Sequence, residues 1–138
     1  MRTLALDIGD VRVGVAVSDP SGSIASPLVV LETARMKRST SEIVSLIDEY
    51  EVERIVVGLP TTLAGEEGPQ ARHVRALAES LLAGVNVPVT FADERLSSTE
   101  ATRRMRESGL TEREMRGSID KVAAAIFLQT VLDGERGR

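Results

Sequence analysis

Two short runs separated by a glycine turn constrain the fold of this chain most strongly. Valine occupies every second position from Val11 to Val17, which is the pattern of a half-buried β-strand. The preceding run, Thr3–Ile8, is mostly apolar, and Gly9 and Asp10 between the two runs predict a tight turn. We therefore expect the chain to open with a β-hairpin.

Asp7 places a carboxylate in the first of these strands, on the face opposite Leu4, Leu6 and Ile8. An unpaired ionised carboxylate inside a sheet costs on the order of several kcal/mol, so a cation or a set of donors has to offset it. Asp7 is therefore a candidate site residue. The alternative is a strand-end aspartate whose oxygens accept bonds from backbone amides.

Composition limits the possible classes of protein. With 138 residues the sequence predicts one domain, 1–138, large enough to bury about two thirds of its unfolded surface. The chain has no cysteine, so disulfides and thiolate metal sites are excluded and a cytoplasmic protein is expected. No run of about eighteen apolar residues occurs, so neither secretion nor a membrane span is predicted.

Charge and aromatic content bear on nucleic acid as a partner. The formal net charge is −4, and the only aromatic residues are Tyr50, Phe91 and Phe127. Base stacking on an aromatic platform is therefore poorly supplied. If nucleic acid is the partner, we expect it to be held through its backbone.

The rest of the chain alternates between helical and strand patterns. Strands are predicted at 24–31, 54–58 and 88–92, and helices from 39, at 74–82, from 97, and from about 118 to 132. Pro27 favours an edge position for the first of these strands, and Ser39 with Glu42 has the spacing of a capping box, as does Ser97 with Glu100. The order predicts an α/β fold, a mixed sheet flanked by helices.

A few acids occur where strands or helices begin or end. Asp93 and Glu94 close the last predicted strand, and Asp120 lies in the first turn of the final helix. If they converge with Asp7, the oxygen-rich cluster suits Mg²⁺ or Mn²⁺, and two such ions about 4 Å apart would clamp a phosphodiester. The alternatives are a helix-dipole role for Asp120, and a solvated loop in which Arg95 pairs with Asp93 or Glu94.

The chain resembles the YqgF/RuvX family of Holliday junction resolvase-like nucleases in the ribonuclease H-like superfamily. Four blocks in the family's order carry the resemblance: Asp7–Asp19, Ile55–Pro60, Asp93–Ser98 and Asp120–Ala124. It implies a ribonuclease H-like five-stranded mixed sheet, in which a three-strand antiparallel meander precedes parallel strands.

The resemblance also implies a function, a metal-dependent phosphodiesterase whose catalytic and metal-binding acids map onto Asp7, Glu94 and Asp120. The implied substrate is the 5′ end of pre-16S ribosomal RNA in ribosome biogenesis, with branched DNA as the older implication. Relatives with better-defined chemistry usually carry a fourth acid, often on the last helix, whereas Lys121 and Ala123 flank Asp120 here. Asp93 or Asp19 would substitute only if its side chain turned inward.

Substrate contacts are predicted beside these acids. Arg12 and Arg95 are candidate phosphate contacts, as are Arg103 and Arg104 in a basic segment interleaved with glutamates. A solvated helix face explains the basic segment equally well. Gly58 would end its strand without a Cβ beside the acids. The lone His73 is expected to be a surface residue rather than a ligand.

Two other functions stay open from the sequence. The hairpin also resembles the first phosphate loop of the actin and sugar-kinase superfamily, although those enzymes close a cleft between two such domains. The second alternative is a catalytically silent RNA-binding or ribosome-assembly module. The sequence does not decide between RNA and DNA, between endo and exo cleavage, between one and two metals, or between monomer and homodimer.

Overall fold

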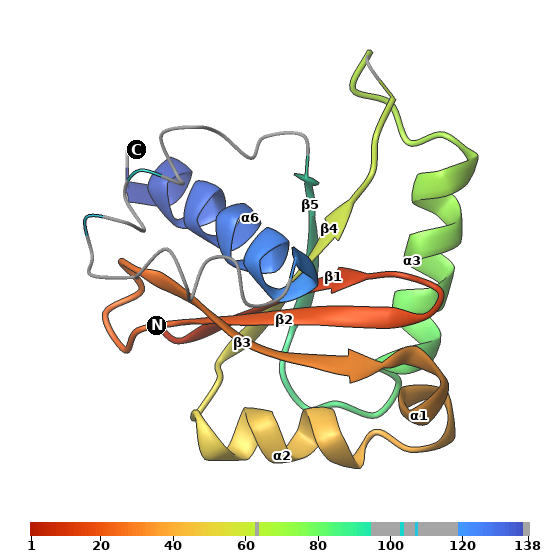
Figure 1. Cartoon of the computed structure of the whole chain (residues 1–138), viewed down its shortest axis with the longest axis horizontal. Coiled ribbons are helices and arrows are strands. Elements are labelled where there is room, and N and C mark those ends of the chain that lie inside the picture. Colours follow the sequence, from red (N-terminus) through yellow and green to blue (C-terminus); the bar gives the residue numbers. More distant parts are fainter. Residues whose placement is uncertain (63, 95–102, 104–106, 108–118, 137–138) are drawn as a thin grey trace.

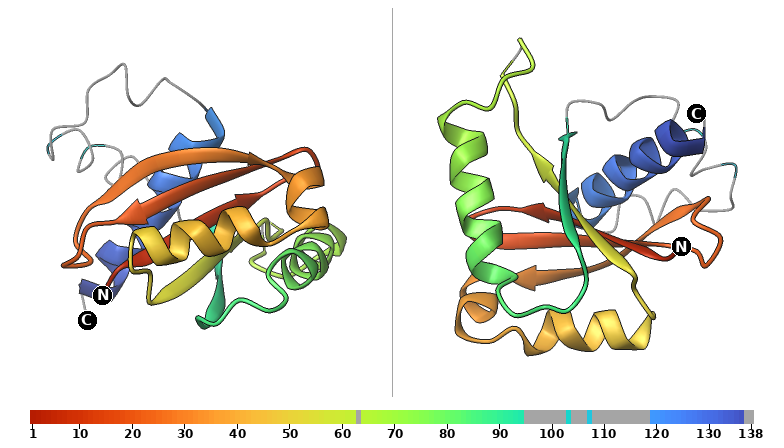
Figure 2. Two further views of the ribbon diagram at one scale, coloured as in Figure 1. Left: turned by 90° about the horizontal axis from the view of Figure 1, so that it is seen from below. Right: turned by 180° about the vertical axis from the view of Figure 1, so that it is seen from behind.

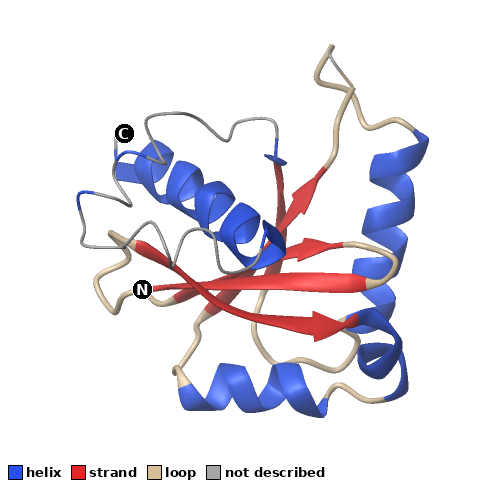
Figure 3. Ribbon diagram, in the orientation of Figure 1, coloured by secondary structure: helices blue, strands red, loops and turns tan. Residues whose placement is uncertain are grey.

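The computed structural model describes residues 1–62, 64–94, 103, 107 and 119–136 (Figure 1). Its centre is a five-stranded sheet in the order β3-β2-β1-β4-β5. The strands are β1 (Thr3–Ile8), β2 (Arg12–Ser18), β3 (Ala25–Glu32), β4 (Arg54–Leu59) and β5 (Val89–Asp93). The helices, coloured blue in Figure 3, are α1 (Thr33–Arg38), α2 (Ser41–Glu49), α3 (Pro69–Leu81) and α6 (Ile119–Arg136).

Strand pairing confirms the expected mixed sheet. β1 is antiparallel to β2, and β2 is antiparallel to β3, which gives the meander. β4 lies parallel to β1 on one side and to β5 on the other. The carboxyl ends of β1, β4 and β5 therefore lie on the same side of the sheet, and ligands bind beyond such strand ends in open α/β sheets.

Helices cover both faces of the sheet (Figure 2). Leu4, Leu6 and Ile8 of β1 pack in a core with residues of α2 and α3. Ala5 of β1 packs on the other face, in a second core with Ala124 and other residues of α6. Asp7 follows the same alternation as Ala5, so the face predicted for it is confirmed and is the face that α6 covers.

The expectation of a half-buried second strand is wrong in two respects. Gly14, Ala16 and Ser18 are buried as well as Val13 and the other inward valines, because α6 covers the face that was expected to be open. Val11, in contrast, is 71% exposed, because it belongs to the turn and not to β2.

The two outer strands differ in how well the sequence anticipated them. β3 is an edge strand, as Pro27 indicated, and the pairing register shifts between Val15 and Ala16 opposite that proline. β5, predicted at 88–92, is confirmed as a strand at Val89–Asp93 and is only partly buried. It forms the other edge of the sheet and has a single neighbouring strand.

The helices also depart from the sequence patterns. α1 was not predicted, and the capping box of Ser39 and Glu42 is not formed: the residue that precedes α2 is Thr40, and Glu42 pairs with Arg35 at 3.5 Å. α3 begins at Pro69, where proline is favoured in the first turn. α6 continues four residues beyond its expected end. No described helix has both the length and the apolar character needed to cross a membrane.

Candidate active site

Asp7 lies near the end of β1, directly across from Gly14 of β2. The pKa of its carboxyl is raised, first by burial and then by the negative charge of Asp120, while a hydrogen bond with Glu94 acts in the opposite direction. Asp7 is therefore an acid held in an environment that disfavours its charge.

Glu94 directly follows β5, which is separated from β1 by β4. Its side chain lies next to that of Asp7. Burial raises the pKa of its carboxyl, and the charge of Asp7 and the hydrogen bond with Asp7 raise it further. The contact between the two side chains has opposite effects on them: it lowers the pKa of Asp7 and raises that of Glu94, as expected when a protonated Glu94 donates to an ionised Asp7.

Gly58 of β4 makes room for Glu94. A Cβ built on Gly58 would lie 3.1 Å from the Glu94 Oε2 and 3.2 Å from its Cβ. This supports the expectation that Gly58 lacks a side chain because the acids lie beside it.

Asp120 reaches the pair through a close approach of α6 to β2. A Cβ on Gly14 would lie 2.1 Å from the Asp120 carbonyl oxygen, so the first turn of α6 rests on the backbone at Gly14. Because Gly14 is the cross-strand partner of Asp7, this contact brings Asp120 next to Asp7. The structure therefore places Asp7 in contact with Glu94 and within reach of the charge of Asp120.

Arg12, predicted as a phosphate contact, is also at this place. Its Nε donates a hydrogen bond to the Asp120 Oδ2 at 3.0 Å. The turn that precedes Arg12 is fastened, since the Gly9 N–H donates to the Arg12 carbonyl at 2.9 Å. The buried Thr33 adds two bonds, from its Oγ1 to the Gly9 carbonyl at 2.7 Å and from its N–H to the Val11 carbonyl at 3.0 Å.

His73 is exposed, as expected, and it has a partner that the sequence did not suggest. Its Nε2 lies 2.6 Å from Oδ1 of Asp10 in the same turn. The hydrogen bond with His73 lowers the pKa of Asp10. Asp10 thus joins the turn to α3.

The donors suit a hard divalent cation, because all are carboxylate oxygens. Their present arrangement does not form a complete ligand set: in the part of the chain that the structure describes, no three His, Cys, Asp or Glu side chains are grouped closely enough to hold a metal ion. Asp7 and Glu94 are in contact, whereas Asp120 is bonded to Arg12.

The two acids considered as substitutes, Asp19 and Asp93, each accept hydrogen bonds from residues outside the Asp7–Glu94 contact. Asp19 accepts bonds in its own turn from Ser21, Ser23 and Ile24, at 2.8, 2.8 and 3.1 Å. The Asp93 Oδ1 accepts a hydrogen bond from the Thr61 hydroxyl at 2.8 Å.

Of the predicted basic contacts, only some lie in the described residues. Arg103 is 3.8 Å from Glu107, one helical turn away, and both side chains are 66% exposed, which favours the solvated-face interpretation. Arg95 and Arg104 lie outside the described residues.

Sequence reasoning missed Gly14 and Thr33. The run of small residues at Gly14, Ala16 and Ser18, all on one face of β2, was the available signal for a close helix contact. Thr33 carried no comparable signal, because its role depends on a turn 24 residues earlier in the chain.

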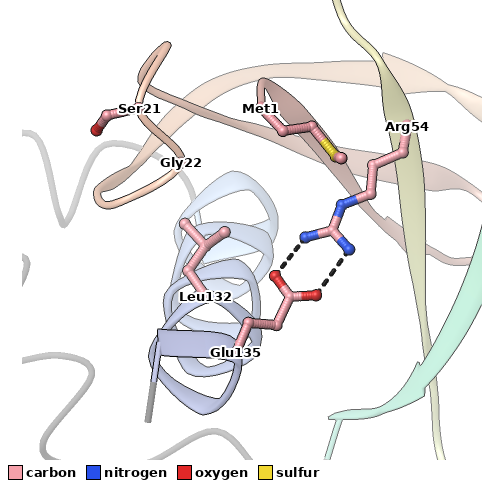
Figure 4. A pocket seen from close by; sticks show the side chains of 6 residues that line it. All are labelled: Met1, Ser21, Gly22, Arg54, Leu132 and Glu135. Carbon is pink, nitrogen blue, oxygen red and sulfur yellow. Dashed lines mark hydrogen bonds and ion pairs between the residues drawn. The ribbon is translucent and has the colours of Figure 1, made fainter. Parts of the chain in front are cut away.

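A surface hollow lies at the other end of the parallel strands, where β1 and β4 begin (Figure 4). It has a volume of about 320 Å³ and is lined by Met1, Ser21, Gly22, Arg54, Leu132 and Glu135. Arg54 and Glu135 form two parallel hydrogen bonds across it, at 2.7 and 2.5 Å. This pair ties the end of α6 to the start of β4 and does not face the acids.

The fold is that of ribonuclease H-like resolvases. The chain superposes on the structure titled "T. thermophilus RuvC in complex with Holliday junction substrate" with a TM-score of 0.65, at 16% identity, over 99% of this chain and 96% of that one. It superposes on the fowlpox virus Holliday junction resolvase with a TM-score of 0.54, at 13% identity, over 99% of each chain.

Sequence comparison is more specific. A relative in Chloroflexus aurantiacus, named "Putative pre-16S rRNA nuclease", is 44% identical over 96% of this chain and 87% of its own length. One of the same name in Anaeromyxobacter sp. (strain Fw109-5) is 45% identical over 97% of this chain and 98% of its own. Residues 1–134 match the family model described as "RuvX: Holliday junction resolvase", and the chain belongs to that family. It is a nuclease, a hydrolase that acts on ester bonds.

Proposed function

We propose that residues 1–138 act as one ribonuclease H-like nuclease domain that needs a divalent cation, Mg²⁺ or Mn²⁺, held by Asp7, Glu94 and Asp120. The observation that carries the proposal is the contact between Asp7 and Glu94 next to the charge of Asp120, with a raised pKa at both bonded acids. Carboxyls that repel one another in a partly buried place are stabilised by a hard cation.

The cation, the acids that would hold it and Arg12 have separate roles in this proposal. The bound cation would supply charge stabilisation at the phosphate and a more acidic water. Asp7, near the end of β1, and Glu94, directly after β5, lie at the same end of the parallel strands and would hold the cation. The Arg12 guanidinium at the anchored hairpin offers donors to a phosphate oxygen.

The proposed substrate is the 5′ end of pre-16S ribosomal RNA, in the cytoplasm. The choice of substrate rests on the names of relatives that are 44% and 45% identical and match over most of their length. Branched DNA is the second candidate, supported by the family description and by the junction complex of the same fold. The proposal applies to a monomer or a homodimer.

The test is to incubate the purified protein with pre-16S rRNA fragments, single-stranded DNA and four-way junctions, each with Mg²⁺, Mn²⁺ or chelator. We expect cleavage that requires the cation and is most rapid on the rRNA fragment. Cleavage in chelator would contradict the metal requirement, and binding without cleavage would support the silent RNA-binding module.

Conservative substitutions test the acids one at a time. Asp7→Asn, Glu94→Gln and Asp120→Asn each replace a charged oxygen ligand with a neutral amide of nearly the same shape. Each should reduce kcat by more than the roughly 10–100-fold that loss of an outer-shell partner costs. Full activity in Asp7→Asn, with circular dichroism unchanged, would exclude this mechanism.

A further inference from the structure

The contact between Arg12 and Asp120 bears on how this site is completed. Both partners stand on fixed supports: Arg12 follows the turn bonded by Thr33, and Asp120 belongs to the turn of α6 that rests on Gly14. Their bond joins residues 108 positions apart in the sequence. It is therefore a tertiary contact between two anchored elements.

The guanidinium of Arg12 is only partly used. Its Nε is bonded to Asp120, and its two Nη groups make no hydrogen bond to any described residue. The side chain as a whole is 62% exposed. A guanidinium has five N–H donors in a fixed fork that matches a phosphate, so Arg12 is able to receive one.

The bond also opposes formation of a metal site. Asp120 lies close enough to Asp7 for its charge to be felt there, yet the described acids do not form a group that could hold an ion. A cation at Asp7 and Glu94 would have to compete with a guanidinium for the Asp120 carboxylate. It would also be repelled by the charge of that guanidinium.

We propose that Arg12 is a positioning residue shared between Asp120 and the substrate: it holds Asp120 in the free protein, and a substrate phosphate draws it away, so that Asp120 joins Asp7 and Glu94 around the cation. This rests on the proposed function and extends it. The cation and the nucleic acid then bind cooperatively, because each one favours the state in which the Arg12–Asp120 bond is broken.

The first measurement is the affinity of the full chain for Mn²⁺ alone, with free Mn²⁺ counted by electron paramagnetic resonance. Arg12→Ala should bind Mn²⁺ more tightly than the parent, by about two- to fivefold, which is the competition that an exposed ion pair can supply. Arg12→Lys keeps the charge and one donor group, so its affinity should stay near that of the parent. Unchanged affinity in Arg12→Ala would overturn the proposal.

The matched control is Arg35→Ala. Arg35 pairs with Glu42 at 3.5 Å, and the two side chains are 56% and 33% exposed, against 62% and 39% for Arg12 and Asp120. The control removes the same charge from a similar pair that does not involve the acids, so it should leave the affinity for Mn²⁺ unchanged.

A double-mutant cycle separates action through Asp120 from simple charge repulsion. The tightening caused by Arg12→Ala should be smaller in an Asp120→Asn background, because no carboxylate is left to release and only the repulsion by the guanidinium remains. Equal tightening in both backgrounds would mean that Arg12 only repels the cation, which would overturn the proposal.

The second measurement concerns the substrate. Stopped-flow anisotropy with a labelled RNA strand reads binding before the strand is cut. Arg12→Ala should bind the strand more weakly and lower its salt slope by about one phosphate contact. Mn²⁺ should tighten RNA binding by a larger factor in the parent than in Arg12→Ala, and equal factors would contradict the exchange.

These outcomes distinguish the inference from the function on which it rests. If Asp7→Asn abolishes binding of Mn²⁺ but Arg12→Ala does not change it, only the role of Arg12 fails. If Asp7→Asn binds Mn²⁺ as the parent does, the proposed metal site itself fails.

Discussion

Burial governs the ionisation of the paired acids, Asp7 and Glu94. Each has a raised pKa, and for each the largest cause is removal from water, followed by the charge of a neighbouring acid. In the folded protein without a cation, these charges oppose stability. An acid kept in such a place serves something other than the fold.

The sign of this effect predicts the behaviour of Asp7→Asn in chelator. The folded protein holds the Asp7 proton more tightly than the unfolded chain, whose pKa is near 3.8. Its contribution to stability is therefore most favourable below that pH and is lost as the pH rises through the raised value. We expect Asp7→Asn to melt at a higher temperature than the parent at pH 7, with a difference that shrinks toward pH 4.

Thermal unfolding followed by circular dichroism between pH 4 and pH 8 measures this difference. Asp48→Asn, at an exposed position of α2, is the matched control and should leave the melting temperature unchanged. A lower melting temperature for Asp7→Asn at pH 7 would show that Asp7 stabilises the fold. Added Mn²⁺ should raise the melting temperature of the parent more than that of Asp7→Asn.

Two glycines of the sheet allow other parts of the chain to approach closely. Gly14 faces the first turn of α6, and Gly58 faces Glu94. At Gly14 the opposing atoms are backbone, which has little freedom to move away. At Gly58 the approach is less close: the Glu94 Oε2 at 3.1 Å is able to rotate away, and the Glu94 Cβ at 3.2 Å needs only a small shift. The two sites should therefore respond differently to an added methyl group.

Gly14→Ala should destabilise the protein and also reduce nuclease activity. Overpacking costs about 1–3 kcal/mol, and the first turn of α6, with Asp120, has to move. Gly58→Ala should affect the free energy of unfolding less, yet displace Glu94 and reduce kcat. Urea unfolding and turnover on the same preparations measure both effects.

Gly134, near the end of α6, is the matched control. A Cβ there meets nothing within 4 Å, so Gly134→Ala should stabilise the protein by up to about 1 kcal/mol through helix propensity alone. Equal effects of alanine at Gly14 and Gly134 would show that the close approach of α6 has no energetic consequence.

For the molecule as a whole, α6 is fastened to the sheet along its length. Beyond Asp120 at its first turn, the fully buried Gln129 accepts a bond from the Ala25 N–H and donates one to the Ser23 carbonyl, both at 2.9 Å. Glu135 near its end is bonded to Arg54. The helix that carries a site acid is thus part of one cooperative structure with the sheet.

Gln129→Met should therefore destabilise the whole chain. It keeps the length of the side chain but leaves the buried Ala25 N–H unpaired, which costs about 1–3 kcal/mol. Urea unfolding should remain a single transition with a lower midpoint, and kcat per folded molecule should be unchanged. Gln70→Met, at an exposed position of α3, is the control and should leave the midpoint in place.

Local patterns determined the meander, the strand carrying Asp7 and the final helix, because alternation and helical periodicity act between near neighbours. They were misleading where tertiary packing intervened: burial of the outer face of β2 and the absent capping box at Ser39 both follow from neighbouring elements. The candidate acids were found from the sequence because a carboxylate at a strand or helix end is visible without its partners.

Only the tertiary structure decided how those acids relate to one another. The bonds from Arg12 to Asp120 and from Ala25 to Gln129 join residues 108 and 104 positions apart, and the Gly14 contact is of the same kind. The two hydrogen bonds leave no periodic trace in the sequence, because each depends on the path of a whole helix across a sheet. The Gly14 contact is visible there only as a run of small residues on one face of a strand. The sequence by itself placed carboxylates near the end of β1, after β5 and in the first turn of α6, and the fold alone gave the last of them, Asp120, a cationic partner.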